Sequence, residues 1–187
     1  MRVGGPTIFA VRYEDVLVSQ AQLKPAGISD PANLSWRGGV IPQFAVGDEL
    51  MFTIQIPHAY VEGTTIYPHV HWTPHTRGNE ENGNTVNWAI EYTIASILTV
   101  FPGEVIESLQ GICSGTDHYH EIGDNSGAAE IDGTGIGISA IISGRIYRAA
   151  GDSWVTNTLG NRPALLHLDF HMLMDTIGSQ SLYSKWS

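Results

Sequence analysis

An alternation of apolar and polar residues with a period of two is the feature that most constrains how this chain can fold. The run from 50 to 56 has an apolar residue at every even position and ends at Pro57. Side chains of an extended strand point alternately to its two faces, so such a run indicates a strand with one buried face. The pattern predicts five strands, at residues 50–56, 67–72, 86–94, 136–142 and 165–172, and weaker ones near 7–12, 15–23, 104–110 and 118–122.

Turn residues such as Asn82-Gly83 and Pro102-Gly103 separate these runs. They predict an all-β protein, an antiparallel β-sandwich of jelly-roll type, with under roughly a tenth of its residues helical. A short helix is allowed at 29–32, where Pro31 limits it. We expect an extended N-terminal arm or edge segment at 1–45, the jelly-roll domain at 46–178 and a C-terminal tail at 179–187.

Composition excludes several classes of function. The formal net charge is −10, and Lys24 and Lys185 are the only lysines, which argues against a nucleic-acid partner. No run approaches the roughly 20 apolar residues of a membrane helix, and residues 1–6 lack the apolar core of a signal peptide. Cys113 is the single cysteine, so we expect no disulfide within the chain. We therefore expect synthesis in a cytoplasm and no membrane partner.

Two strands carry histidines at alternate positions. His69 and His71 share one face of the first, and His167, Asp169 and His171 share one face of the second. We expect the two strands to lie in one sheet or to pack together, with the opposite faces in a common core (Pro68, Val70 and Trp72; Leu166, Leu168, Phe170 and Met172). Asp169 would then hold an imidazole proton or complete the coordination of a transition metal.

The histidines allow three interpretations: a metal site, a buried polar network or a solvated sheet face. Gly63 precedes His69-Val70-His71 by the spacing of the first cupin motif, which implies a metal-binding enzyme using His69 and His71. The pattern departs from that family where it needs a glutamate, because His75 and Thr76 stand there, and the second cupin motif is absent. The structural interpretation is favoured, with no metal or other cofactor. His118-Tyr119-His120 is a further alternating pair.

The block Tyr67-Pro68-His69-Val70-His71-Trp72, within residues 63–72, resembles a family of small virion proteins of tailed bacteriophages. The resemblance extends over 86–92, 133–139, 165–171 and 175–179. It implies a non-enzymatic structural protein of the virion, either a capsid decoration or cement protein or a component of a neck or tail appendage. The resemblance implies that its partners are major capsid, neck or tail proteins. It also implies synthesis in the host cytoplasm before assembly into the virion.

A glycan-binding module is the third interpretation, because an exposed tryptophan can stack on a sugar. The five tryptophans are candidates, although Trp72 and Trp88 fall in strand patterns and are expected in the core. We also expect a homo-oligomer, most simply a trimer, with residues 1–45 or the tail lying on another subunit. Tyr183 and Trp186 in the tail motivate this expectation, and an ordinary terminal strand is the alternative for the tail.

Overall fold

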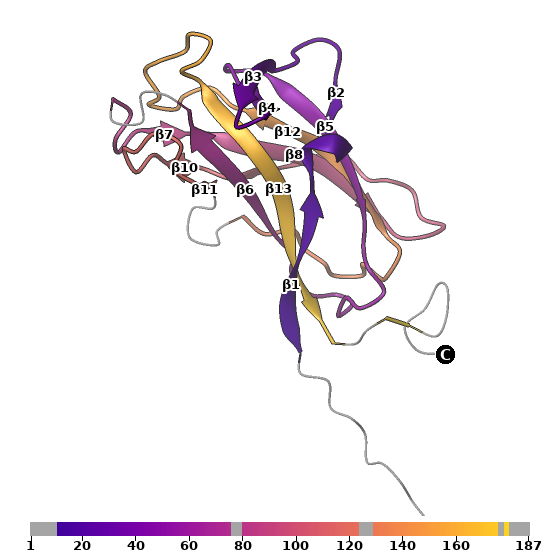
Figure 1. Ribbon diagram of the computed structural model, residues 1–187. Helices are drawn as coiled ribbons and strands as arrows, with labels where there is room; N and C mark the ends of the chain where they lie inside the picture. The colour runs from indigo at the N-terminus through magenta and orange to yellow at the C-terminus, as the bar shows by residue number, and fades with distance from the viewer. Residues whose placement is uncertain (1–10, 76–79, 124–128, 176–177, 180–187) are drawn as a thin grey trace, which may run out of the picture.

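The computed structural model describes residues 11–75, 80–123, 129–175 and 178–179, which form two antiparallel β-sheets packed face to face (Figure 1). This confirms the predicted all-β antiparallel sandwich. The one helical element among the described residues is a 3-10 turn at Gln20–Gln22, and the short helix that the sequence allows at 29–32 does not form. Within the described part of the chain, no helix has the length and hydropathy that crossing a bilayer requires.

The first sheet has the strand order β3-β4-β13-β6-β11-β10-β7, and β1 also pairs with β13. Strand β13 is the longest and lies between β6 on one side and β4 and β1 on the other. The bounds are β1 Arg12–Val18, β3 Ala32–Trp36, β4 Gly39–Gln43, β6 Tyr67–Pro74, β7 Thr85–Val86, β10 Gly111–Ile112, β11 Glu121–Gly123 and β13 Pro163–Met174.

The second sheet has the order β2-β5-β12-β8-β9. Its strands are β2 Lys24–Pro25, β5 Glu49–Gln55, β8 Trp88–Ala95, β9 Val105–Ser108 and β12 Ile141–Arg148. The core lies between the sheets, where Phe52 of β5 meets Phe170 of β13 with ring centroids 5.6 Å apart. Trp72 of β6 and Trp88 of β8 are fully buried there, as their strand patterns predicted.

Strand β13 contains a β-bulge that corrects the predicted apolar face. Leu165 pairs with Trp72 and His167 with His71, so β13 has one residue more than β6 between these pairs. The extra residue shifts the alternation of inward-facing and outward-facing side chains by one position. Leu165 is therefore fully buried and Leu166 only half-buried, whereas the alternation had placed Leu166 in the core.

The strand expected at 136–142 is displaced. Gly135 and Ser139 have φ values of 76° and 62°, and turns at 134–135 and 138–139 precede β12, which begins at Ile141. The weaker predictions correspond to β1, β9 and β11, each with shifted bounds. Residues 7–10 of the first weak strand lie outside the described residues.

Much of the predicted arm belongs to the sandwich of its own chain. Strand β1 pairs with β13 from Arg12 to Val18, and β3 and β4 form a hairpin at the edge of the first sheet. Of the predicted tail, Ser179 forms a hydrogen bond through its hydroxyl with Nδ1 of His58 at 2.7 Å. Tyr183 and Trp186 lie outside the described residues, so their docking stays a prediction.

Candidate functional site on the histidine face

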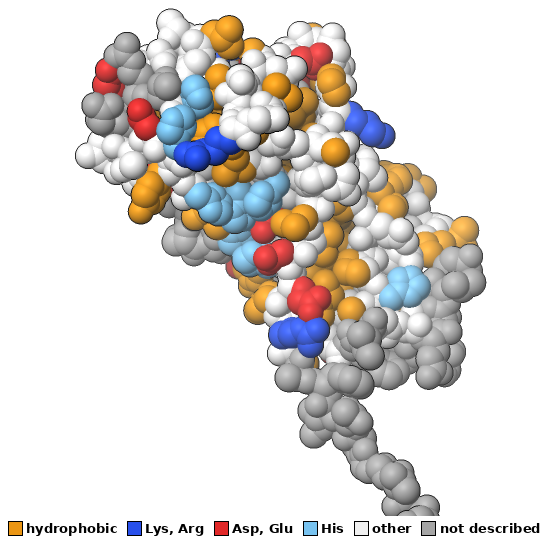
Figure 2. Space-filling view, viewed as in Figure 1, with side chains coloured by type: hydrophobic (Ala, Val, Ile, Leu, Met, Phe, Trp, Pro, Cys, Tyr) orange, Lys and Arg blue, Asp and Glu red, His pale blue; other side chains and the backbone are white. Residues whose placement is uncertain are grey.

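The predicted histidine strands are direct neighbours in the first sheet. β6 supplies His69 and His71, and β13 supplies His167, Asp169 and His171, all on the face opposite the core. This confirms that the two strands share a sheet. Figure 2 shows histidine side chains gathered on the side of the molecule where Figure 1 places β6 and β13. We call these five residues, together with His120 and Asp15, the histidine face.

Two pairs of imidazoles stack across the strands. The rings of His71 and His167 lie 4.2 Å apart between centroids at an angle of 19°, and those of His69 and His171 lie 4.0 Å apart at 22°. The register pairs His71 with His167 directly and His69 with Asp169. Asp169 therefore lies between the two stacks.

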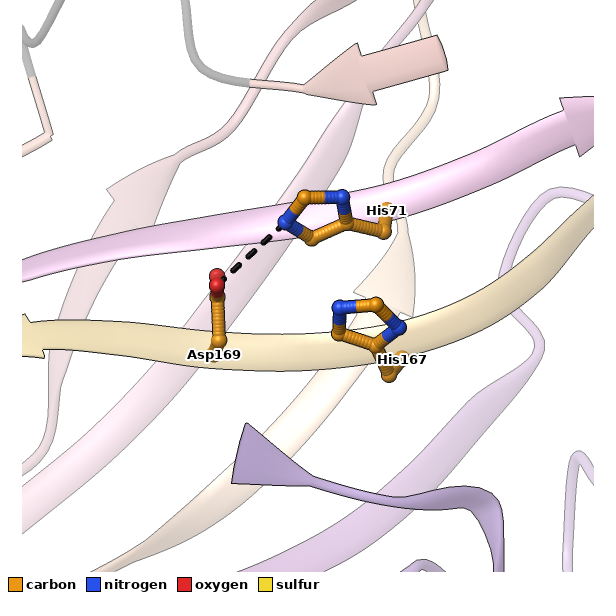
Figure 3. Close-up of side chains that lie close together, drawn as sticks. All are labelled: His71, His167 and Asp169. Carbon is orange, nitrogen blue, oxygen red and sulfur yellow. Dashed lines mark hydrogen bonds and ion pairs between the residues drawn. The ribbon is translucent and has the colours of Figure 1, made fainter. Parts of the chain in front are cut away.

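A chain of polar contacts runs from solvent to Asp169. His120 Nε2 lies 2.7 Å from His71 Nδ1, and His71 Nε2 lies 3.3 Å from Oδ2 of Asp169 (Figure 3). The carboxylate can only accept, so in neutral imidazoles Nε2–H of His71 donates to Asp169 and Nε2–H of His120 donates to His71. Asp169 thus fixes the tautomers of both rings, as expected for a carboxylate beside histidine.

Asp169 is 1% exposed, and its neighbours compensate its charge only in part. Oδ2 lies 3.3 Å from His71 Nε2 and 3.7 Å from His171 Nε2, while Oδ1 is buried without a hydrogen-bond partner among the described residues. His171 is also 2.9 Å from the exposed Asp15. Burying a carboxylate is costly unless it is paired, so this oxygen marks the point of the histidine face that most needs a partner.

His167 differs from the other imidazoles of the histidine face. Burial lowers its pKa from the usual value of 6.5, and the neighbouring His71 lowers it further, although the charge of Asp169 opposes both. Its ring nitrogens have no hydrogen bond with any described residue. A neutral imidazole has an unprotonated nitrogen, the form in which histidine binds a metal.

Sequence reasoning missed two members of the histidine face. A partial indication of His120 was present in the sequence, because His118 and His120 alternate, but no sequence pattern placed His120 beside His71. It comes from the loop before β11, whose Ile122 pairs with His71. Asp15 had no signal, because its position depends on β1 pairing with β13, where it lies opposite His171.

The remaining histidines lie apart from this cluster. His75 and His118 pack on Trp36, with ring centroids 5.9 and 5.1 Å away, and Nδ1 of His75 lies 3.3 Å from the carbonyl oxygen of Gly160. His58 lies between the hydroxyls of Ser139 and Ser179. These contacts are those of histidines that hold loops in place.

The arrangement bears on the two other functional interpretations. A cupin holds its metal inside a barrel, whereas His69 and His71 project from the sheet face opposite Val70 and Trp72, which fill the core. Trp72, Trp88 and Trp154 are buried, so none of these three offers a ring to a sugar. Trp36 is half-buried against His75 and His118, and Trp186 lies outside the described residues.

Comparisons with protein-family models, with curated proteins and with solved structures find no match to this chain.

Proposed function

We propose that this protein is a non-enzymatic structural subunit of a tailed-bacteriophage virion, either a capsid decoration protein or part of a neck or tail appendage. The resemblance of residues 63–72 and of the later blocks to such proteins is one support. These blocks cover most of β6 and part of β13, the two strands that carry most of the histidine face. The observation that carries the proposal is the exposed apolar surface formed by the β8–β9 loop and the edge strand β9.

We also infer a jelly roll from the order of strand pairing. Eight strands taken in chain order pair first with last (β4 with β13), second with seventh (β5 with β12), third with sixth (β6 with β11) and fourth with fifth (β8 with β9). A long hairpin rolled into two sheets has this order. Capsid proteins, lectins and cupins all use jelly rolls, so the fold alone does not choose among the three functions.

The loop between β8 and β9 exposes apolar side chains that its own chain does not use. Leu98 is fully exposed and has a φ of 63°, a left-handed conformation that leucine rarely adopts. Val100 is 90% exposed, and Ile97 and Phe101 are also exposed. An exposed, strained leucine contributes little to folding, whereas strain of this kind is typical of functional surfaces.

Beside this loop, β9 is an edge strand of the second sheet, and its Val105 and Ile106 are exposed on the two faces of the strand. We call Ile97, Leu98, Val100, Phe101, Val105 and Ile106 the assembly patch. Its occupant in our proposal is a second copy of this chain. The other edge of this sheet, at β2, has a hollow of about 360 Å³ that Lys24 and Met51 line. Glu104, which precedes Val105 of the assembly patch, has the charge opposite to that of Lys24.

A contact between the β9 edge of one copy and the β2 edge of the next is heterologous, and such a contact forms a ring when its rotation closes and an open filament when it does not. We propose a trimer as the simplest such ring. Pairing through sheet edges also covers backbone groups that would otherwise promote aggregation. Capsid decoration and neck or tail appendage are equal alternatives for the location of the ring.

The oligomer is tested by light scattering on the purified full chain at micromolar concentration. We expect a trimer for the wild type and a shift toward monomer for Leu98→Asn combined with Val100→Asp. Asparagine tolerates a positive φ, so the change at 98 does not strain the loop. Val155→Asp is the matched control, because Val155 is 73% exposed outside the patch, and it is expected to leave the mass unchanged.

Cryo-electron microscopy of purified particles from the phage that encodes the chain tests the location. Density for this sandwich on the capsid, neck or tail is expected. Absence of the protein from particles would refute the virion proposal, and a monomeric wild type would refute the assembly patch. Metal-dependent turnover of a small molecule by a protein absent from particles would favour the cupin-like enzyme instead.

A further inference from the structure

We propose that His71, His167 and Asp169 bind one divalent transition-metal ion, Zn²⁺ being the best match, on the histidine face. The proposal is independent of the virion proposal, because it concerns an ion held within one chain. Each of the three residues offers one ligand atom, and these atoms all lie within 4.8 Å of one another. Two imidazole nitrogens and a carboxylate oxygen form a donor set that zinc commonly uses.

The geometry already approaches that of a bound ion. Two ligand atoms about 2.1 Å from a tetrahedral ion lie about 3.4 Å apart. The distance of 3.3 Å between His71 Nε2 and Asp169 Oδ2 matches this separation. Figure 3 shows the His167 ring beside the His71 ring, on the strand that also carries Asp169, and the ligand nitrogen of His167 lies within 4.8 Å of the other two ligand atoms.

The second, independent observation is the buried carboxylate. Among the described residues only imidazoles contact Asp169 as potential cations, and its Oδ1 has no hydrogen-bond partner. A divalent ion at the site would supply the positive charge that this carboxylate lacks. It would also use the ring nitrogens of His167, which make no hydrogen bond to the described residues.

His120 fits the role of an outer partner. When Nε2 of His71 binds an ion, its Nδ1 carries the proton and donates to His120 Nε2, 2.7 Å away. Metal-bound histidines usually donate their other ring N–H in this way, which orients the ring and raises its basicity. The tautomers of His71 and His120 would therefore change together on binding.

A neighbouring group, Asp15, Asp169 and His171, also has ligand atoms within 4.8 Å. It offers a single imidazole, and Asp15 is exposed on β1. Transition ions favour imidazole nitrogen over carboxylate oxygen, so the group with two histidines is the preferred one. A fourth ligand position would face solvent and take water.

The test uses the full chain purified without a polyhistidine tag. Titration with Zn²⁺ alone is expected to show one ion bound per chain, and Co²⁺ is expected to give the visible absorption of a tetrahedral site. His167→Gln and Asp169→Asn should each weaken Zn²⁺ binding by about 100-fold or more, since outer partners alone contribute about 10–100-fold. His118→Gln removes a histidine outside the site and should bind as the wild type does.

Thermal unfolding gives a second readout, because a ligand that binds only the folded state raises its melting temperature. Zn²⁺ should raise the melting temperature of the wild type and of His118→Gln but not that of His167→Gln. His167 is only half-buried, so this variant keeps the test decisive even if Asp169→Asn fails to fold. No stoichiometric binding by the wild type, or unchanged binding by His167→Gln, would overturn the proposal.

Discussion

At the residue scale, Glu81 shows how a single carboxylate joins two loops that are distant in the chain. It is fully buried and accepts hydrogen bonds from the backbone N–H groups of Val155 and Thr156, at 2.9 and 2.7 Å, and from Asn84 at 2.9 Å. Burial raises its pKa, but the hydrogen bonds from Thr156, Val155 and Asn84 outweigh burial and hold the pKa below the usual value of 4.5. The ionised form is therefore part of the folded structure.

Glu81→Gln is expected to lower the free energy of unfolding by about 2–3 kcal/mol at neutral pH, because the charge is lost and one accepting oxygen is replaced by an NH2 group that faces N–H donors. A carboxylate whose pKa is lowered by folding stabilises the protein above its unfolded pKa, and this contribution disappears as the pH falls through its folded pKa. The difference between wild type and variant should therefore shrink below pH 4.5. Urea unfolding at a series of pH values measures it.

Glu80→Gln is the matched control, because Glu80 is exposed beside the buried residue. It is expected to change the free energy of unfolding by less than about 0.5 kcal/mol. A loss in Glu81→Gln that is equally large at pH 7 and at about pH 3 would contradict the role of the ionised carboxylate.

At the element scale, β12 depends on a residue without a side chain. Gly144 lies in the centre of the second sheet, between β5 and β8. A Cβ atom added there would lie 2.3 Å from the carbonyl oxygen of Glu91 and 2.8 Å from the Cα of Tyr92. Both are backbone atoms of a paired strand, so neither can move without disturbing the ladder.

Gly144→Ala is expected to lower the free energy of unfolding by about 1–3 kcal/mol through this overlap. Ser143→Ala is the control on the same strand, since the Ser143 hydroxyl makes one exposed contact with Thr53 and its loss should cost less than about 0.5 kcal/mol. Chemical denaturation of both variants measures the difference. Equal stability of the two variants would contradict this prediction, because it would show that the sheet can make room for a Cβ atom at position 144.

β12 also shows why part of the fold could not be predicted. The strand at 50–56 was recognised because its apolar residues alternate without interruption. β12 contains Gly144 and turns Arg148 into the core, where its guanidinium donates to Asp152, Asn157 and the carbonyl of Phe44. A buried arginine breaks the apolar pattern, whereas Ile136 and Ile138, which alternate just before β12, lie outside any strand.

Most of the histidine face could be predicted, because its residues follow the same period-two alternation as the clear strands. The prediction was incomplete where the position of a residue depends on how distant strands pair. Period two placed His69 with His71 and His167 with Asp169 on single faces. The bulge near Leu166 and the contacts of Asp15 and His120 depend on pairing between distant segments. Local patterns carry no information on such pairing.

At the scale of the whole molecule, the last strand is the one on which the first sheet depends. β13 pairs with β1, β4 and β6, and its Leu168, Phe170 and Met172 are fully buried. Its removal divides the first sheet into β3-β4 and β6-β11-β10-β7, leaves β1 without a partner strand and opens the core. The loss of three large apolar side chains from the core exceeds the marginal stability of a domain.

A chain ending at Arg162, just before β13, is therefore expected not to fold. Far-ultraviolet circular dichroism should show loss of the sheet signal, and thermal unfolding should lack a cooperative transition. A chain ending at Ser179 is the control, because it keeps every described residue, and it is expected to melt cooperatively. Cooperative melting of the shorter chain would contradict the central role of β13.

The central position of β13 also has a consequence for biosynthesis. The hundred residues between the end of β6 and the end of β13 take about 5–20 s to translate at about 5–20 residues per second. During that time the edges of β4 and β6 that pair with β13 have no partner strand and are open to other chains emerging from the same polysome. We therefore expect the yield of soluble protein to depend on how crowded the nascent chains are, more than on the stability of the finished sandwich.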